Sequence, residues 1–298
     1  MILVTGSTGF IGKALVPELL DRGYKLAVLV NKTPPHNDWI DRVKVLTADI
    51  TKEEIFKIKD YPFTKIIHLA AYIPQKDTPD ELENCLKANV IGTNNLLEFA
   101  RIRGITRFIN SSSAIVYDVT ERPKVFKENS RVSPKTYYGM SKLLGEMLCE
   151  KYRKIASIKT ISLRYSYIYG PGMPEHFVFG KFLNFVKKGE DIPIYGTGKG
   201  VRDFIYIKDV IKAIMLALEG DIVGCFNIGT SVGISLSELA EKIIRATNSK
   251  SRIIFHQDQK EDKSRTILDI SKAMKRLSFN PVYTMEKGLT DYLRNSGS

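Results

Sequence analysis

The first thirty residues, "MILVTGSTGFIGKALVPELLDRGYKLAVLV" (residues 1–30), decide the fold. Residues 2–4 are a short apolar run typical of a buried strand, and a turn with three glycines follows it. Leucines at a helical spacing come next, and Gly23 ends that helix. Residues 26–30 are a second apolar run of the buried kind. A strand, a crossover helix and a parallel strand make a right-handed βαβ unit.

The turn between the first strand and the helix has glycines three residues apart, at Gly6, Gly9 and Gly12. Glycine lets the backbone curl tightly and approach a pyrophosphate without a side chain in the way. The helix that follows offers free N–H donors and a partial positive charge to the phosphates. Because the glycines lie between a strand and a helix, the sequence predicts dinucleotide binding. A turn that only packs the helix on the strand is the alternative.

The second strand of such a unit normally ends in an acid that binds the adenosine ribose. Here the residues are Asn31 and Lys32. Asn31 can hydrogen-bond a ribose hydroxyl, and Lys32 can meet a 2′-phosphate or simply face solvent. The missing carboxylate favours NADP over NAD. Asp49 ends the next apolar run, where it would meet the adenine or cap a helix starting at Thr51 or Lys52.

Strand and helix patterns continue to alternate. We expect strands at residues 43–51, 65–71 and 106–117 and a long helix at residues 79–103. Ligands bind at the carboxyl ends of the strands in open α/β sheets. The glycine turn, Asp49, Ala70 with Ala71, and the serines at residues 111–113 all fall at such ends. The sequence therefore predicts that they converge on one edge of the sheet.

The stretch "TYYGMSK" (residues 136–142) begins a predicted helix. Tyr138 and Lys142 are four residues apart and share a helix face, whereas Tyr137 points elsewhere. An ammonium beside a phenol favours the phenolate, so it would lower the phenol pKa from about 10. Tyr138 would then be a usable general base near neutral pH. The alternative is a packing tyrosine beside a solvated lysine, and the convergence of strand ends favours the catalytic interpretation.

The length of 298 residues, 43% of them hydrophobic, suits one large α/β domain or two modest ones. We expect residues 1–170 to form a NAD(P)-binding Rossmann domain. Residues 171–298 would form a smaller mixed α/β substrate lobe, with some segments returning to the first domain. Apolar helices are expected at residues 175–189 and 234–247, the second capped by Ser235 or Ser237.

The cysteines, Cys85, Cys149 and Cys225, lie far apart in the sequence, which predicts neither a metal site nor a disulfide framework. We see no signal peptide or membrane-spanning stretch and expect a cytoplasmic protein. The formal net charge is +12, but acids lie among the basic residues, as in "DKSRTILDISKAMKR" (residues 262–276). Because the basic residues are dispersed and form no clustered basic face, the sequence argues against nucleic-acid binding despite its net positive charge.

Six stretches occur in the order of a known family. They are "TGSTGFIG" near residue 5, "HLAA" at 68, "SSSAIVY" at 111, "YGMSK" at 138, "RDFIYIKDV" at 202 and "FNIG" at 226. Together they resemble the extended short-chain dehydrogenase/reductases, specifically the nucleotide-sugar epimerase/dehydratase branch, over almost the whole chain. The resemblance implies a Rossmann-like doubly wound parallel sheet with a smaller carboxy-terminal substrate lobe, and a homodimer.

The resemblance also implies roles for single residues. Ser113 would hydrogen-bond the reacting sugar oxygen, Tyr138 would be the general base, and Lys142 would lower its pKa and hold the nicotinamide ribose. Arg202 would grip the pyrophosphate of a nucleotide-diphosphate sugar. The expected contacts with NAD or NADP are Gly6, Gly9, Phe10, Ile11, Gly12, Asn31, Lys32, Asp49, Ile50, Leu69, Ala70, Ala71, Ser111, Tyr138, Lys142 and Tyr165. The expected substrate contacts are Tyr72, Ser113, Tyr167, Phe177, Arg202 and Arg265.

The chain departs from the family pattern at three places. The ribose acid is missing, and Tyr167 stands where many members carry a substrate-binding asparagine. Residues 259–262, Gln-Lys-Glu-Asp, stand where members often have an arginine before a Pro-Gly-Asp stretch. Arg265 is the candidate for the second phosphate contact in its place, or else one charge on a solvated surface.

The serine run separates the reactions within the family. Related 4,6-dehydratases carry an Asp-Glu pair there, and reductases that also epimerise carry a cysteine near the position of Ala114. This chain has neither. A nucleotide-sugar 4-epimerase is the function that remains, with an NADPH-dependent 4-ketosugar reductase as the alternative. A non-catalytic dinucleotide sensor is the third possibility, because a fold alone does not imply a function.

Overall fold

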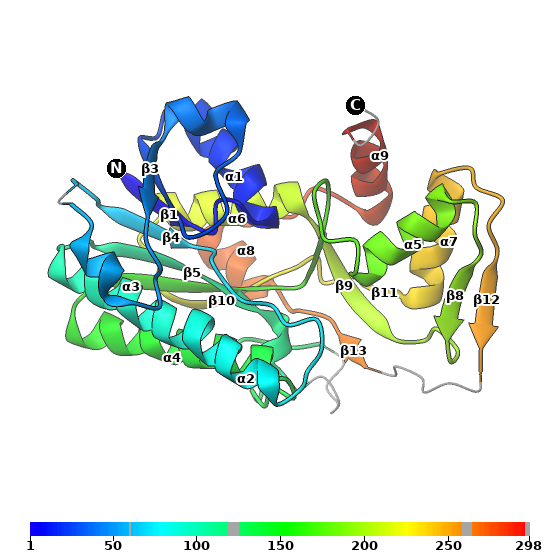
Figure 1. Ribbon diagram of the computed structural model, residues 1–298. Coiled ribbons are helices and arrows are strands. Elements are labelled where there is room, and N and C mark those ends of the chain that lie inside the picture. The colour runs from blue at the N-terminus through cyan, green and yellow to red at the C-terminus, as the bar shows by residue number, and fades with distance from the viewer. Residues whose placement is uncertain (60, 119–124, 258–263, 296–298) are drawn as a thin grey trace.

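The central sheet of the computed structural model has seven parallel strands among the described residues, which are 1–59, 61–118, 125–257 and 264–295. Their order is β10-β6-β5-β4-β1-β2-β3 (Figure 1). The strands are β1 (Ile2–Thr5), β2 (Leu26–Val30), β3 (Lys44–Thr47), β4 (Lys65–His68), β5 (Arg107–Ser113), β6 (Lys159–Tyr165) and β10 (Gly224–Ile228). The predicted parallel sheet is confirmed, with β3 ending two residues before Asp49.

Two hydrophobic cores lie on opposite faces of this sheet. Successive residues of a strand point to opposite faces, so Ile2 and Val4 enter one core and Leu3 the other. Both faces are buried, which explains the continuous apolar runs of the sequence. Figure 1 shows the helices α1 and α6 on one face and α3 and α4 on the other. Their bounds are α1 (Phe10–Asp21), α3 (Gly92–Ile102), α4 (Tyr137–Ile155) and α6 (Ile207–Glu219).

The long helix predicted at residues 79–103 is present but not uniform. It consists of α2 (Asp80–Cys85), a π-helical segment η3 (Leu86–Ile91) and α3, which follow one another without a break. The outer bounds agree with the prediction to within one residue at each end. The π-helical segment was not predicted, and such segments are frequent at functional sites.

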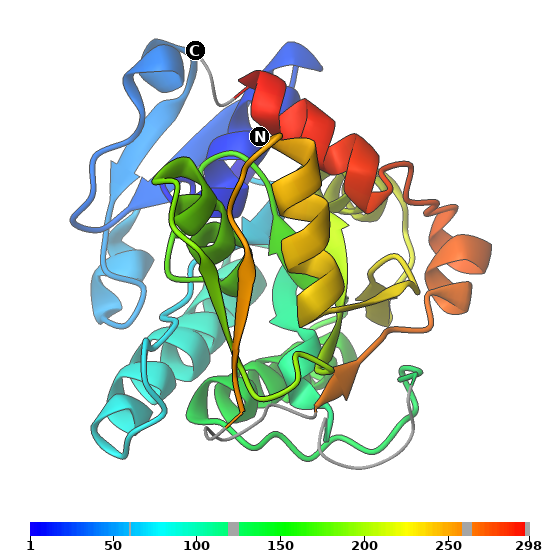
Figure 2. The ribbon, with the colours of Figure 1, turned by 90° about the vertical axis from the view of Figure 1, so that its right-hand side faces the viewer.

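The second part of the molecule is a mixed α/β lobe, as expected. A four-stranded sheet contains β7 (Tyr167–Tyr169), β9 (Val201–Tyr206), β11 (Gly233–Ser235) and β13 (Arg265–Thr266). A separate pair is formed by β8 (Ile192–Tyr195) and β12 (Ile253–His256). Figure 2 shows α7 and α9 beside one another, with β12 nearby. The helices of this part are α5 (Val178–Lys187), α7 (Leu236–Ala246) and α9 (Met285–Asn295).

The two predicted helices of the second part are confirmed as α5 and α7. Ser235, not Ser237, caps α7: its Oγ accepts a hydrogen bond from the backbone N–H of Glu238 at 3.1 Å. The carboxylate of Glu238 in turn accepts from the backbone N–H of Ser235 at 2.8 Å. These two bonds are a capping box, in which each residue satisfies a free donor of the other.

The chain crosses between the two parts more than once. β10 pairs with β6, and α6 and α8 (Ser271–Leu277) pack against the first sheet or its edge. In the other direction, β7 precedes residue 170 but pairs with β9. A boundary at residue 170 stays a prediction about domains; the strand pairing shows that segments after it return to the first sheet.

The three thiols are free, with Cys85 and Cys149 buried and Cys225 partly exposed. Within the residues that the structure describes, no group of three His, Cys, Asp or Glu side chains is placed to hold a metal ion. Over the same residues, no helix combines the length and the apolar character that crossing a membrane would require.

Candidate active site

The glycine turn is shaped so that side chains would collide with backbone. Gly6 has φ +71°, and a Cβ there would lie 2.5 Å from the amide nitrogen of Ala70. A Cβ on Gly12 would lie 2.2 Å from the carbonyl oxygen of Gly6. These contacts require glycine at both positions, and they press β1, α1 and the end of β4 together. Phe10 and Ile11 begin α1 and are partly buried against the core on the α6 face.

Asn31 and Lys32 follow β2 and are exposed. Asp49 follows β3, and its Oδ1 accepts hydrogen bonds from the backbone N–H and the Oγ1 of Thr51 at 2.9 and 2.8 Å. Burial acts to raise the pKa of Asp49, but the bonds from Thr51, together with Lys52 and Asn31, outweigh it and hold the pKa below its usual value. The helix expected to start at Thr51 or Lys52 is the 3-10 helix η2 (Glu53–Lys57), which begins one residue after Lys52, and among the described residues no side-chain bond from Asp49 caps it.

The end of β4 supplies the floor beside the glycine turn. Leu69 and Ala70 donate their backbone N–H groups to Thr5, at 3.2 Å to its carbonyl oxygen and 3.3 Å to its Oγ1. His68 is buried and its ring nitrogens lie 2.8 Å from Thr5 Oγ1 and 2.9 Å from Thr93 Oγ1. Burial lowers the pKa of His68 to about 3, so the ring is neutral at physiological pH. His68 is therefore a neutral packing residue at the strand end, held by two threonine hydroxyls.

The start of α4 lies against the turn that follows β5. Ser113 caps this turn, η4 (Ala114–Val116), and its Oγ accepts from the backbone N–H of Ile115 at 3.3 Å. A Cβ on Gly139 would lie 2.8 Å from the carbonyl oxygen of Ile115, so glycine lets the helix approach this closely. The approach brings the first turn of α4, with Tyr138, against the turn that Ser113 begins.

Lys142 lies one helical turn after Tyr138 and is 7% exposed. Its Nζ donates to the carbonyl oxygen of Ser111 at 2.8 Å and lies 5.7 Å from the centre of the Tyr138 ring. Tyr137 instead donates its backbone N–H to Asp77 at 2.9 Å. The predicted shared face of Tyr138 and Lys142 is confirmed.

The expected lowering of the Tyr138 pKa is wrong in this structure. Burial raises the pKa of the phenol above its usual value, because a phenolate is disfavoured away from water. Burial also lowers the pKa of Lys142 to about 8, although the nearby carboxylate of Glu146 acts in the opposite direction. Desolvation is therefore the largest influence on the pKa of both Tyr138 and Lys142. The spacing of the two residues along the helix does not reveal how deeply they are buried.

Two further residues at the site, Asn89 and Ser7, are missing from the contacts predicted from the sequence. Asn89 lies in the π-helical segment, 2% exposed, and its Oδ1 accepts from the backbone N–H of Tyr72 at 2.7 Å. Its Nδ2 lies 2.9 Å from Ser141 Oγ, which donates to the carbonyl oxygen of Tyr138. An asparagine inside a long helix was the available signal. Ser7 lies in the glycine turn, fully buried, and its Oγ has no hydrogen-bond partner among the described residues.

The two predicted pyrophosphate contacts lie on neighbouring strands of the second sheet, β9 and β13, but the register Arg265↔Val201 places their side chains on opposite faces. The guanidinium carbon of Arg202 lies 5.2 Å from the centre of the Tyr167 ring. Its Nη1 donates to the carbonyl oxygens of Val201 and Ser264 at 3.0 and 2.9 Å. Arg265 is exposed on β13, in register with Val201 of β9. Tyr167 therefore places its ring against Arg202, where many family members would offer the amide of an asparagine. Residues 259–262, the third departure from the family pattern, lie outside the described residues.

The remaining predicted residues are placed as follows. The phenol of Tyr72 donates to Glu81 at 2.5 Å, which attaches it to α2. Phe177 is the residue before α5 and is partly buried. Tyr165 is 4% exposed, faces Ser113 in the β5–β6 register, and its hydroxyl has no partner within the described chain. Ile50 packs over Gly92 at the start of α3.

The amino-acid sequence matches one family model over most of its length. Residues 2–229 match the model described as the NAD dependent epimerase/dehydratase family. The chain belongs to this family. It is therefore an enzyme of the extended short-chain dehydrogenase/reductase kind, as its motifs indicated.

Relatives of this epimerase/dehydratase chain have more than one activity. A dTDP-4-dehydro-6-deoxyglucose reductase of Escherichia coli is 31% identical, over 99% of this chain and 96% of the reductase. A UDP-glucose 4-epimerase of Mycolicibacterium smegmatis is 28% identical, over 98% of each chain. The structure of a UDP-glucuronic acid 4-epimerase from Bacillus cereus, in complex with UDP-glucuronic acid and NAD, has a TM-score of 0.87. It is 27% identical, with 99% of each chain covered.

The glycine turn of this epimerase/dehydratase chain fits a dinucleotide. Gly6 and Gly12 leave no side chain over the turn, and α1 begins directly behind it with free backbone N–H groups. The buried, unpartnered Oγ of Ser7 is a polar group suited to the same ligand. Gly6, Ser7, Gly9 and the start of α1 are the residues that would hold the pyrophosphate of NAD or NADP. The preference for NADP stays a prediction.

Proposed function

We propose that this protein is a nucleotide-sugar 4-epimerase. The observation that carries the proposal is the turn that Ser113 begins, η4 (Ala114–Val116), which lies against the start of α4 and contains no acid. Ala114 and Val116 occupy η4 and are both buried. A dehydratase needs an acid to protonate the leaving hydroxyl, and this turn supplies none.

The side chains of the site have separate tasks in this reaction. Ser113 would hydrogen-bond the oxygen on C4, and Tyr138 would take the proton from that hydroxyl and later return it. Burial disfavours the phenolate of Tyr138 in this structure, and the positive charge of Lys142, 5.7 Å from the ring centre, would act against this effect of burial without removing it. Bound NAD supplies the hydride chemistry. Inversion requires the oxidised sugar to turn before it is reduced again.

The substrate that we propose is a nucleotide-diphosphate sugar. Arg202 lies on β9 of the second sheet, and guanidinium groups bind phosphate through paired hydrogen bonds. Arg265, on the opposite face of the neighbouring strand β13, is the candidate for a second contact. Charge-assisted contacts of this kind would hold the diphosphate while the sugar reaches Ser113. The Bacillus cereus enzyme, which shares the fold, is seen with UDP-glucuronic acid.

An NADPH-dependent 4-ketosugar reductase is the second candidate. The 31% identity to the Escherichia coli reductase and the exposed Lys32 after β2 favour it. The two functions differ in their use of cofactor, because an epimerase regenerates it and a reductase consumes NADPH. A sensor that does not catalyse is disfavoured, since Tyr138, Lys142 and the serine turn are packed together.

The test is NMR of UDP-, dTDP- and GDP-hexoses incubated with purified enzyme and trace NAD or NADP. A product inverted at C4 with unchanged mass, lost in Tyr138→Phe, is the expected result. Consumption of NADPH with 4-keto sugars, and no inversion of any hexose, would instead establish the reductase. A Tyr138→Phe variant that kept its cellular role would support the sensor.

We also propose that the protein is a homodimer formed through α4 and the helix beside it. Apolar side chains are exposed on this face at Leu82, Leu86, Met140, Leu144 and Met147. The helices α2, η3 and α4 pack against one another, so these side chains lie on adjoining helices. Light scattering should give twice the chain mass, and Leu144→Glu should halve it. Val232→Glu, at an exposed apolar residue after β10, is the matched control.

A further inference from the structure

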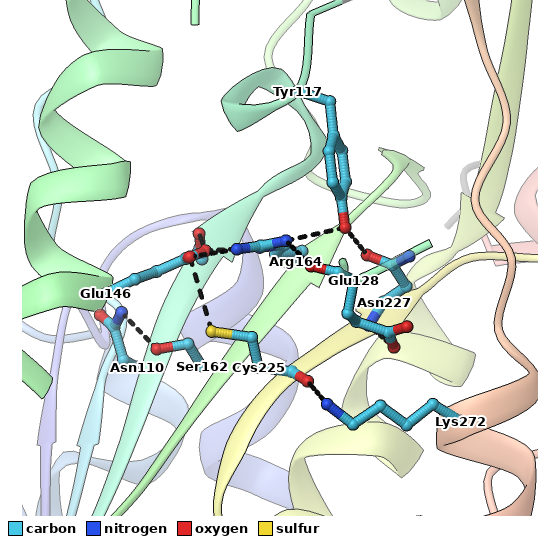
Figure 3. Close-up of polar contacts among 10 residues, drawn as sticks. Asn110, Tyr117, Glu128, Glu146, Ser162, Arg164, Cys225, Asn227 and Lys272 are labelled. Carbon is cyan, nitrogen blue, oxygen red and sulfur yellow. Dashed lines mark hydrogen bonds and ion pairs between the residues drawn. The ribbon is translucent and has the colours of Figure 1, made fainter. Parts of the chain in front are cut away.

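A buried ion pair joins α4 to β6 behind the active site (Figure 3). Arg164 donates through Nε to Glu146 Oε1 at 2.9 Å and through Nη2 to Oε2 at 2.6 Å. The side chains of Arg164 and Glu146 are only 6% and 4% exposed. Taking two charges out of water is costly, and an apolar pair of similar size often stabilises a core as well. The pair therefore calls for an explanation beyond stability.

The carboxylate of Glu146 is attached to the serine run at the end of β5. Ser112 Oγ donates to Glu146 Oε1 at 2.5 Å. On one side of Ser112 the carbonyl oxygen of Ser111 accepts from Lys142, and on the other side lies Ser113. The Glu146 carboxylate thus holds Ser112, the middle residue of the serine run at residues 111–113.

Glu146 also lies one helical turn after Lys142, so Tyr138, Lys142 and Glu146 follow one face of α4. The titratable groups that face Lys142 are Tyr138, Glu146 and Cys149 from α4 and His68 from β4. Burial raises the pKa of Cys149 and lowers that of His68 to about 3, so both are uncharged at neutral pH. Glu146 is then the negative charge in this group.

Arg164 is itself fixed from the opposite side. Its Nη1 donates to the hydroxyl of Tyr117 at 2.8 Å, and its guanidinium carbon lies 4.9 Å from the centre of that ring. The Tyr117 hydroxyl donates in turn to Asn227 Oδ1 at 2.7 Å. Figure 3 shows this chain of contacts from α4 to β10. Asn227 belongs to the "FNIG" stretch, which this contact connects to the Arg164–Glu146 pair through Tyr117.

We propose that Glu146 is a positioning residue, which holds the serine run through Ser112 and keeps Lys142 protonated, with Arg164 fixing its carboxylate. The inference rests on the proposed function, because it assigns Ser113 and Lys142 their roles there. Without the negative charge, burial would act on Lys142 unopposed and the lysine would lose its proton at lower pH. Activity that requires protonated Lys142 falls as the pH rises, and in the absence of the Glu146 charge this alkaline loss of activity would begin at a lower pH.

The test compares Glu146→Gln with the double variant Glu146→Gln/Arg164→Met, which leaves no lone buried charge. In both we expect kcat to fall about 10-fold to 100-fold, with KM for the nucleotide sugar changed less than about threefold. The alkaline limb of the kcat profile should move to lower pH by about one unit. Ser112→Ala should lower kcat but leave that limb in place, because the Glu146 charge remains.

Glu150→Gln is the matched control. Glu150 lies one turn further along α4 and pairs with Arg153 at the surface, where its side chain is 44% exposed. The same loss of charge there should leave kcat and the pH profile unchanged. A folded double variant with the kcat and the alkaline limb of the wild type would overturn the proposal, and so would an equal effect of Glu150→Gln.

The ionisation of Lys142 can also be followed without any substrate. Carbon-13 NMR of ε-labelled lysine, with Lys142→Met to assign the signal, should show a lower pKa in Glu146→Gln than in the wild type. An unchanged Lys142 titration would overturn the proposal whatever the substrate. Wild-type enzyme that turned over no nucleotide sugar would instead count against the proposed function, so the two failures are distinguishable.

Discussion

The two sides of the site are built on different physical grounds. On the cofactor side, at the glycine turn, backbone lies against backbone, and Gly6 and Gly12 leave no room for even a Cβ. On the proposed substrate side, at β7, β9 and β13, the shape depends on side chains, as where the guanidinium of Arg202 lies over the Tyr167 ring. The cofactor side is therefore intolerant of change, whereas the substrate side can vary among relatives that keep the same fold.

The difference explains how relatives with different activities share one framework. The glycine turn, which is shaped by backbone contacts, suits the dinucleotide cofactor that the family has in common. In the proposed function the side chains of β7, β9 and β13 would select the substrate, and Tyr167 stands there in place of the asparagine expected from the family resemblance. The predictions below test this contrast from its strongest consequence to its weakest.

Gly12→Ala should have the largest effect. The new Cβ would lie 2.2 Å from the carbonyl oxygen of Gly6, so the backbone of the turn must move. We expect a loss of about 3 kcal/mol in the free energy of unfolding, typical of an overpacked core. Displacement of the turn should also lower the affinity for NAD by about 100-fold, equivalent to about 3 kcal/mol. Urea denaturation and calorimetric titration with NAD measure the two effects.

Gly9→Ala is the control for this prediction. Its Cβ would lie 3.3 Å from the same oxygen, and its φ of −81° is open to any residue. A small shift of the turn accommodates that contact, so stability should change by less than about 1 kcal/mol. Equal losses in the two variants would contradict the view that backbone collision decides this side.

The same contrast separates what the sequence predicted from what it did not. The βαβ unit, the strand ends and the shared face of Tyr138 and Lys142 follow from period and spacing, and all are present. The raised pKa of Tyr138 depends on burial by elements distant in the chain. Asn89 and Glu146 were missed for a similar reason, because their partners Tyr72 and Arg164 lie 17 and 18 residues away.

Arg202→Met should raise KM for the nucleotide sugar by about 30-fold, the equivalent of about 2 kcal/mol from charged hydrogen bonds. The kcat should change less than about threefold, since Arg202 would hold the diphosphate equally in ground and transition states. Steady-state kinetics measure both. Arg265→Met is the informative comparison, because a similar rise in KM there would establish a second phosphate contact. No change in KM for Arg202→Met would remove Arg202 from the substrate side.

Tyr167→Leu should have a smaller effect. It removes the ring at 5.2 Å from the Arg202 guanidinium, and such cation–π contacts contribute about 1 kcal/mol. We therefore expect KM to rise about fivefold, with Tyr167→Phe unchanged because it keeps the ring. A rise in Tyr167→Phe equal to that in Tyr167→Leu would mean that the hydroxyl, not the ring, makes the contact. Kinetics of the three proteins side by side decide between ring and hydroxyl.

Lys32→Glu should have the smallest effect, and it concerns a side chain of the cofactor side, not its backbone. Lys32 is exposed, so its attraction for a 2′-phosphate is screened by water and contributes about 1 kcal/mol. Affinity for NADP should fall about fivefold to tenfold while affinity for NAD is unchanged, and the difference should shrink at high salt. Titration of both cofactors at two salt concentrations measures this. Equal changes for NAD and NADP would show that Lys32 does not read the 2′-phosphate, and the choice of cofactor would then depend on other residues near the ribose.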